Sequence, residues 1–204
     1  MKYKTLIFFL LIISCLGISL ANDTKTIQNT GFSKIENVNI DTVKQEWTKL
    51  HNLERSKYWL SWYILDSNLN KTAKTRSDKL TNSWTIKNLH QRSSKDWYYN
   101  YVNIKSRFTW LWVSFEDVSW TLFTESIWRW YYKCNKLDCT QDLIKSIKST
   151  FKFFMSEKNK KSKPHYNGIV MKKFSNIWVW ISIDKKTNRY FLVSHYWVNT
   201  INTK

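Results

Sequence analysis

The stretch IWVWISIDKKTNRYFLVSHY, residues 177–196, decides the fold class that we expect for this chain of 204 residues. Isoleucine and valine occupy every second position from Ile177 to Ile183, and Arg189–Tyr196 is again typical of a strand. The polar segment KKTN joins the two runs. Alternation with a period of two on both sides of a short polar turn predicts an antiparallel β-hairpin. A shorter strand is predicted within Val113–Val118.

Helical periodicity dominates the chain before this hairpin. The clearest case is Thr140–Glu157, which we expect Thr140 to cap, with apolar residues spaced three or four apart. The same spacing predicts helices from Asp41 onward, at about Ser67–Thr81, and at Tyr98–Phe108. Helices followed by antiparallel strands predict an α+β fold, arranged as α-β-α layers around an antiparallel sheet.

Length and composition fit one globular domain with a strongly cationic surface. Hydrophobic residues make up 43% of the chain, which is enough for a sizeable core. The formal net charge is +18, and the basic residues are 27 Lys and 6 Arg. Because arginine is the residue that recognises phosphate and guanine by two parallel hydrogen bonds, a lysine-led charge favours an anionic envelope or polymer over nucleic acid.

The N-terminus has the pattern of an export signal. Lys2 and Lys4 precede an apolar run and small residues that end at Ala21, which predicts a signal peptide over residues 1–21 and a secreted product. The alternative is a lipoprotein signal with lipid attached to Cys15. No later segment is long and apolar enough to span a membrane. We expect a polar lead-in at 22–40, one domain at 41–197 and a tail at 198–204.

Two cysteines follow the signal region, Cys134 and Cys139. In an exported chain, two cysteines at this short spacing predict a disulfide that closes a small loop. A metal site would need further ligands, and none lie nearby in the sequence.

Tryptophan is abundant and glycine scarce, with 13 Trp and 3 Gly, where ordinary usage gives about 14 glycines. Many tryptophans stand at expected turns and helix ends, where glycine is favoured. We hypothesise that the source decodes UGA as glycine and that these codons were translated as tryptophan. The alternative is a Trp-rich surface that contacts sugar or lipid. Trp47 and Trp97 are retained as tryptophan. The predicted glycine positions are Trp59, Trp62, Trp84, Trp110, Trp112, Trp120, Trp128, Trp130, Trp178, Trp180 and Trp197.

Several short motifs occur in a characteristic order. They are His51-Asn52-x-x-Arg55, Leu69-x-x-x-Ala73, Leu89-His90-x-Arg92, Phe123-Thr124-Glu125-Ser126-Ile127, Glu157, His165-Tyr166, the segment 178–180 read as Gly-x-Gly, and Leu192-x-x-His195-Tyr196. With glycines restored, residues 41–197 resemble the CAP superfamily (cysteine-rich secretory proteins, antigen 5 and pathogenesis-related proteins; the SCP domain), in its bacterial secreted branch.

The resemblance implies a three-layer α-β-α sandwich whose central cleft holds a divalent metal, often zinc. Carried over by position, the metal site consists of His90, Glu125, Glu157 and His165. Ser126 replaces the family's asparagine, and the gap between His90 and Glu125 is long. Imidazoles are common zinc ligands, and a carboxylate can orient water or act as a base. We expect His51 to pack or cap locally and His195 to be structural.

Three functions follow from these expectations. The first is a secreted, metal-capable CAP-domain module that binds components of the envelope or of neighbouring or host cells, including lipid as the resemblance suggests. The second is a zinc-dependent hydrolase of peptide or cell-wall substrates, with Glu125 or Glu157 as the general base. The third is a cationic adhesion module. We favour binding over catalysis.

Overall fold

The computed structural model describes residues 37–83, 88–93, 95–96, 99–115, 123–184, 186–198 and 200–201. The predicted signal peptide at 1–21, with Cys15, therefore lies outside the described residues. Most of the lead-in and of the C-terminal tail also lies outside them.

The centre of the fold is a four-stranded sheet in the order β1-β4-β5-β3. The predicted hairpin forms β4 (Asn176–Asp184) and β5 (Arg189–Trp197), which pair antiparallel. A third long strand, β3 (Phe123–Tyr131), runs antiparallel to β5. The short β1 (Ile64–Leu65) is parallel to β4, so the sheet is mixed at that edge and antiparallel elsewhere.

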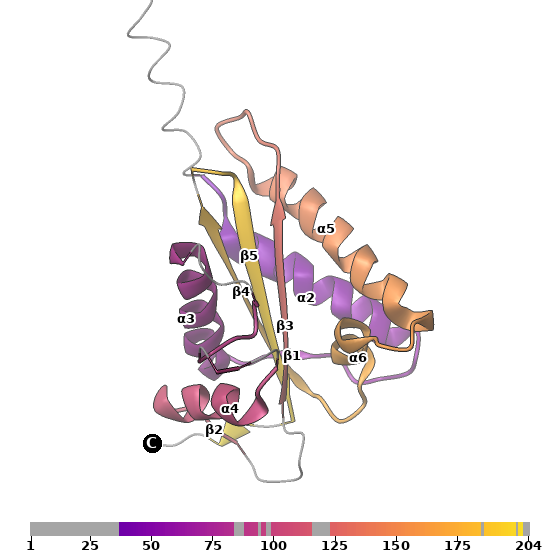
Figure 1. Cartoon of the computed structure of the whole chain (residues 1–204). Coiled ribbons are helices and arrows are strands. Elements are labelled where there is room, and N and C mark those ends of the chain that lie inside the picture. Colours follow the sequence, from indigo (N-terminus) through magenta and orange to yellow (C-terminus); the bar gives the residue numbers. More distant parts are fainter. Residues whose placement is uncertain are drawn as a thin grey trace, which may run out of the picture.

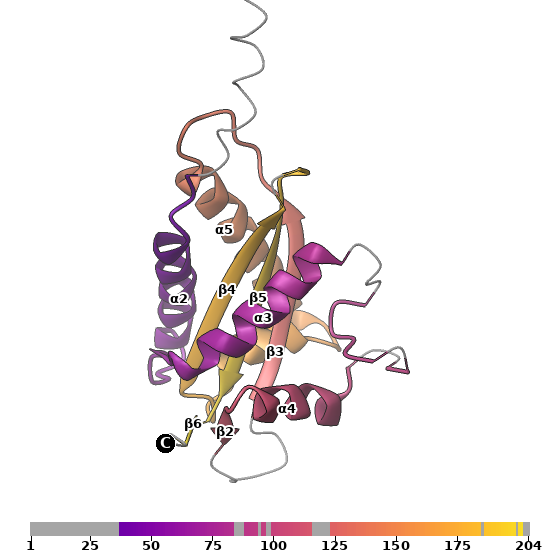
Figure 2. The same ribbon diagram turned by 90° about the vertical axis from the view of Figure 1, so that its left-hand side faces the viewer.

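Helices cover both faces of this sheet (Figures 1 and 2). On one face lie α2 (Ile40–Ser56), α5 (Thr140–Ser156) and the short α6 (Pro164–Val170), which follows a 3₁₀ turn at Glu157–Asn159. On the other face lie α3 (Asn68–Asn82) and α4 (Tyr101–Trp110). A small pair of β2 (Ser114–Phe115) and β6 (Thr200–Ile201) lies near α4 (Figure 2). The α+β prediction, with α-β-α layers, is confirmed.

The larger part of the core lies between the sheet and the α2–α5 layer. Trp47 of α2 is fully buried there, packs edge-on against Phe151 and Phe154, and donates a hydrogen bond from Nε1 to Ser194 Oγ at 2.9 Å. The apolar stripe expected on 140–157 is the buried face of α5. On the opposite face, Leu69 and Phe108 pack in a second cluster between α3 and α4.

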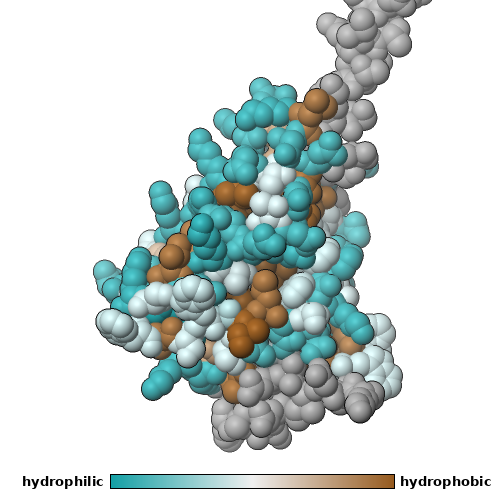
Figure 3. Space-filling view, turned by 180° about the vertical axis from the view of Figure 1, so that it is seen from behind, coloured by the Kyte–Doolittle hydropathy of each residue, from teal (hydrophilic) through white to brown (hydrophobic). Residues whose placement is uncertain are grey.

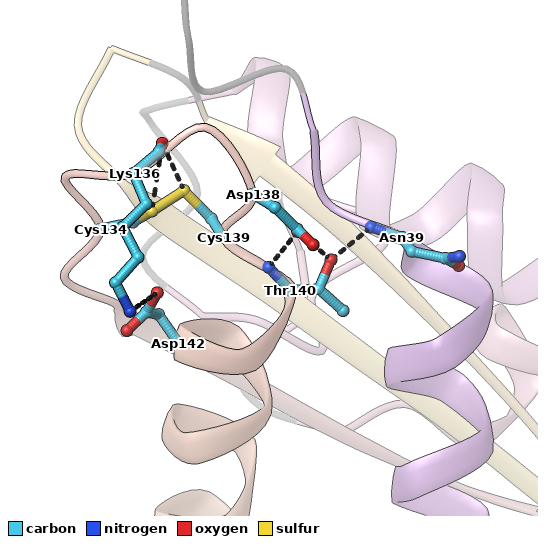
Figure 4. The surroundings of a disulfide bond; sticks show 7 residues. All are labelled: Asn39, Cys134, Lys136, Asp138, Cys139, Thr140 and Asp142. Atoms are coloured by element: carbon cyan, nitrogen blue, oxygen red, sulfur yellow. Dashed lines mark hydrogen bonds and ion pairs between the residues drawn. A yellow bond between two sulfur atoms is a disulfide. The ribbon is translucent and has the colours of Figure 1, made fainter.

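The predicted disulfide Cys134–Cys139 is present at the start of α5 (Figure 4). Beside it, Asp138 accepts hydrogen bonds from the backbone N–H and the hydroxyl of Thr140, and Asn39 N–H donates to the same hydroxyl at 2.9 Å. Asn37 forms a parallel bridge with Asp138. The loop closed by the disulfide therefore ties the entry of the domain to α5.

Two helices end with a tryptophan in the left-handed region. After α2, Trp59 has φ 56°, its N–H donates to Ser56 O, and Leu60 N–H donates to Arg55 O. After α4, Trp112 has φ 61°, its N–H donates to Thr109 O, and Val113 N–H donates to Phe108 O. Both are Schellman C-caps, in which the left-handed residue is usually glycine because any side chain there is strained.

The other predicted glycine positions fall on varied elements. Trp84 and Trp120 lie outside the described residues. Trp62 precedes β1, Trp110 ends α4, and the rest stand on strands of the sheet, namely Trp128, Trp130, Trp178, Trp180 and Trp197.

Hydrophilic residues cover most of the face drawn in Figure 3, with apolar residues gathered near its middle. Within the described ranges, no helix has the length and apolarity needed to cross a bilayer.

Candidate functional site

The buried carboxylate of Glu125 is the centre of the first group of polar side chains. Glu125 lies on β3, and the register of β3 with β5 places it opposite His195. His195 Nε2 lies 2.9 Å from Glu125 Oε2, and His90 Nδ1 lies 3.0 Å from Oε1. Arg92 donates to Oε2 from Nη2. The Glu125 carboxylate therefore links β5, through His195, to the loop that follows α3.

Electrostatics keep this carboxylate ionised. Burial alone would raise the pKa of Glu125, but the Arg92 charge and the hydrogen bonds from His195 and His90 hold that pKa well below its usual range. Burial lowers the pKa of His195, and Glu125 opposes this only in part. His195 is therefore neutral near pH 7, with Nε2–H donated to Glu125 and Nδ1 facing Thr72 Oγ1 at 2.9 Å.

The loop that carries His90 and Arg92 is held by a buried aspartate. Asp96 accepts from the backbone N–H groups of Arg92 and Ser93 at 2.9 and 2.8 Å. Its other oxygen accepts from the side-chain amides of Asn100 and Asn103 at the start of α4. The position of Arg92 is thereby coupled to the position of α4.

A second histidine–carboxylate pair lies between α5 and α6. Glu157 follows α5 directly, and its Oε1 lies 2.7 Å from His165 Nδ1. Glu157 Oε2 accepts from the backbone N–H groups of His165 and Tyr166. The His165 ring stacks on Phe154 at 4.1 Å and meets Trp128 of β3 edge-on at 6.2 Å. The contact with Phe154 holds the pair against α5 and does not depend on Trp128, which is one of the predicted glycine positions.

The two pairs lie within electrostatic reach of each other. Burial lowers the pKa of His165, Glu157 opposes that change, and the charge of His90 lowers the pKa further. Within the part of the chain that the structure describes, however, no three His, Cys, Asp or Glu side chains lie close enough together to hold a metal ion. The four predicted residues form two histidine–carboxylate pairs and not one four-ligand cluster.

Two residues of the first group, Arg92 and His195, were not among the predicted site residues. Arg92 stands in the quoted motif Leu89-His90-x-Arg92, and its pairing with Glu125 gives that motif a physical basis. His195 was expected to be structural, and its direct bond to Glu125 could be inferred only from the β3–β5 register. His51 is packed as expected, with Nδ1 2.8 Å from Trp47 O and Nε2 3.0 Å from Tyr196 Oη.

No protein-family model and no curated protein matches the chain. Several solved structures are similar in fold. An extracellular protein containing an SCP domain from Bacillus anthracis str. Ames has 14% identity and a TM-score of 0.45. NaASP2, described with Zn²⁺, has 14% identity and a TM-score of 0.47, and a cysteine-rich secretory protein from Staphylococcus aureus subsp. aureus Mu50 has 13% and 0.46.

The matches cover 78%, 74% and 81% of this chain respectively, and 41%, 77% and 40% of those proteins. The chain thus spans less than half the length of the two bacterial proteins. The descriptions of those two name an SCP domain and a cysteine-rich secretory protein.

Proposed function

We propose that this chain is a secreted CAP-domain binding module in which His90 and His165 bind a divalent metal such as zinc. The observation that carries the proposal is the pair of histidine–carboxylate contacts, His90–Glu125 and His165–Glu157. An ionised carboxylate only accepts hydrogen bonds, so each Nδ1 carries a proton, and in the neutral form of each imidazole the lone pair that a metal requires is on Nε2.

Such an arrangement suits a metal-binding histidine. In protein metal sites, a carboxylate commonly accepts the second N–H of a ligating histidine, which fixes the ring and raises its basicity. We therefore give Glu125 and Glu157 the role of orienting the two imidazoles. With two protein nitrogens, a bound zinc would keep open positions and could polarise an oxygen of a ligand or of water.

The same contacts favour binding over hydrolysis. A general base works best when its pKa is near the working pH. Glu125 is far from this condition because Arg92 and two imidazoles already occupy its oxygens and lower its pKa. Glu157 is occupied by His165 and by two backbone N–H groups. Neither carboxylate is placed to take a proton from water.

The partner that the proposal implies is an anionic component of the cell envelope or of a neighbouring cell. The net charge of +18 favours such surfaces at low salt, and the resemblance to the CAP superfamily suggests lipid among the ligands. Purely electrostatic adhesion would decay steeply with salt and would not depend on His90 or His165. Secretion is tested by sequencing the exported product, which is expected to begin at Asn22.

The four histidines provide the test of the metal site, since each gives its own imidazole signal in NMR. On titration with zinc alone, we expect the signals of His90 and His165 to shift together, with His51 and His195 as internal controls. His90→Ala and His165→Ala should each weaken zinc binding at least tenfold, and His51→Gln should not. Equal zinc affinity in the His90→Ala/His165→Ala double variant would overturn the proposal.

A further inference from the structure

A second site is indicated by a cavity of about 230 Å³ between α3 and α4, which Arg92 and His195 line but His90, Glu125, Glu157 and His165 do not. Four basic side chains border it, Arg76 and Lys79 from α3, Arg92 from the following loop, and Arg107 from α4. No carboxylate is among the described residues that line it. Arg92 is paired with Glu125, and Arg76, Lys79 and Arg107 form no ion pair with a carboxylate among the described residues.

Arg76 is the most informative of these residues. Its side chain is buried, with only 4% of the residue exposed, and its Nη2 donates to the carbonyl oxygens of Leu89 and Gln91. Its Nε and Nη1 are buried and meet no acceptor among the described residues. Burial and the charge of Arg92 lower the pKa of Arg76 to about 10. Buried donors without acceptors are rare, and a hydrogen bond from a charged guanidinium to an oxyanion is among the stronger ones.

Apolar side chains of α4 also line the cavity. Ile104 and Phe108 point inward from α4 and are 0% and 2% exposed, and Leu111 follows the helix. The Phe108 ring meets the His195 ring edge-on at 4.7 Å, so this wall is rigidly placed. Trp110, one of the predicted glycine positions, is 68% exposed at the rim, and the apolar wall does not depend on it.

We propose that this cavity binds a small amphipathic carboxylate, whose head group accepts hydrogen bonds from Arg76 and whose short tail packs against α4. Taking about 30 Å³ for each water-sized group, the volume holds on the order of eight non-hydrogen atoms. Hexanoate has this size. Longer chains would have to extend beyond the cavity, and a fully hydrated anion would leave the Ile104–Phe108 wall without a contact.

The test uses hexanoate on the full mature protein, with hexanol and acetate as matched probes that lack the charge or the tail. We expect hexanoate to bind saturably, to raise the melting temperature, and to shift the NMR signal of His195, which lines the cavity, while the signal of His165 stays in place. Hexanol and acetate should each bind at least tenfold more weakly. Arg76→Met should weaken hexanoate binding at least tenfold, and Arg129→Met, on the exposed part of β3, should not.

Three outcomes would overturn the proposal. The first is no saturable binding of hexanoate. The second is equal binding of hexanol, which would make the cavity purely apolar, or equal binding of acetate or inorganic phosphate, which would make it a simple anion site. The third is unchanged hexanoate binding by Arg76→Met. If Arg76→Met does not fold, Leu111→Gln tests the tail contact instead, and equal hexanoate binding by that variant contradicts the proposal. Because His90 and His165 do not line this cavity, the zinc titration and the hexanoate titration test different sites, and failure of one does not imply failure of the other.

Discussion

Replacing Trp59 and Trp112 by glycine is expected to stabilise the folded domain. Both residues are left-handed C-caps, with φ 56° and 61°. A non-glycine residue pays about 1–2 kcal/mol for that conformation. The side chains of Trp59 and Trp112 are 97% and 84% exposed, so removing them loses little buried apolar surface in the folded state. Glycine is more flexible in the unfolded chain, which offsets about 0.5–1 kcal/mol.

The expected gain is therefore about 0.5–1 kcal/mol at each site, and about 1–2 kcal/mol for the double variant, because the two caps are independent. In a domain of this size that corresponds to a rise in Tm of about 2–8 °C. Urea unfolding at pH 7 and calorimetry measure both quantities. Trp47→Gly is the control: because Trp47 is fully buried, this variant should have a free energy of unfolding about 3–5 kcal/mol lower than that of the wild type.

Destabilisation by Trp59→Gly and Trp112→Gly would refute the strain argument. We propose that these two positions, with the nine others named above, are glycines encoded by UGA. Trp178 supports this at a third position, since its Nε1 is buried and meets no acceptor among the described residues. The codons give an independent test, because UGG at Trp59 and Trp112 would exclude recoding there whatever the unfolding data show.

Three further predictions concern stability. Burial lowers the pKa of His51 from 6.5 to about 3, so as the pH drops below 6.5 the unfolded chain takes up a proton that the folded chain does not, and the folded state loses stability. We expect the free energy of unfolding, measured in urea, to fall by about 2 kcal/mol between pH 7.5 and pH 5. If the stability of His51→Gln fell with pH as steeply as that of the wild type, the prediction would be contradicted. Glu125→Gln should lose about 3 kcal/mol at pH 7, because Arg92 stays buried without its partner. The pKa of Glu125 is depressed, so that difference should narrow below pH 4.5 in unfolding curves, and a constant difference would argue against the ion pair. Replacing Cys134 and Cys139 by serine should cost about 2 kcal/mol for so short a loop, and reduced wild-type protein should unfold like the variant.

The elements predicted from periodicity were the ones whose buried face is apolar. The β4–β5 hairpin and α5 formed close to their predicted bounds, since each has a regular apolar face against the core. The first helix begins one residue before the predicted start, and its cap is Asn39, whose side chain accepts from Thr42 N–H. Asp41 and Asn39 are both good caps, and sequence alone does not rank them.

The third long strand, β3, was not predicted. Its residues 124–130 include Glu125, Ser126 and Arg129, and the two tryptophans at 128 and 130 obscure any alternation. Glu125 and Ser126 are buried because their partners come from β5 and from the loop at His90, which only the assembled sheet provides. Missing β3 also concealed the contact between Glu125 and His195, so the site could be predicted only as far as the motif order allowed.

The bridge between Asn37 and Asp138 fixes the direction in which the chain enters the domain. This clasp lies at one end of the sheet, and α4 lies at the other (Figure 1). If the protein is tethered to a surface through residues before Asn37, the tether holds the clasped end inward. The end of the sheet beside α4, which lines the α3–α4 cavity, then faces away from that surface.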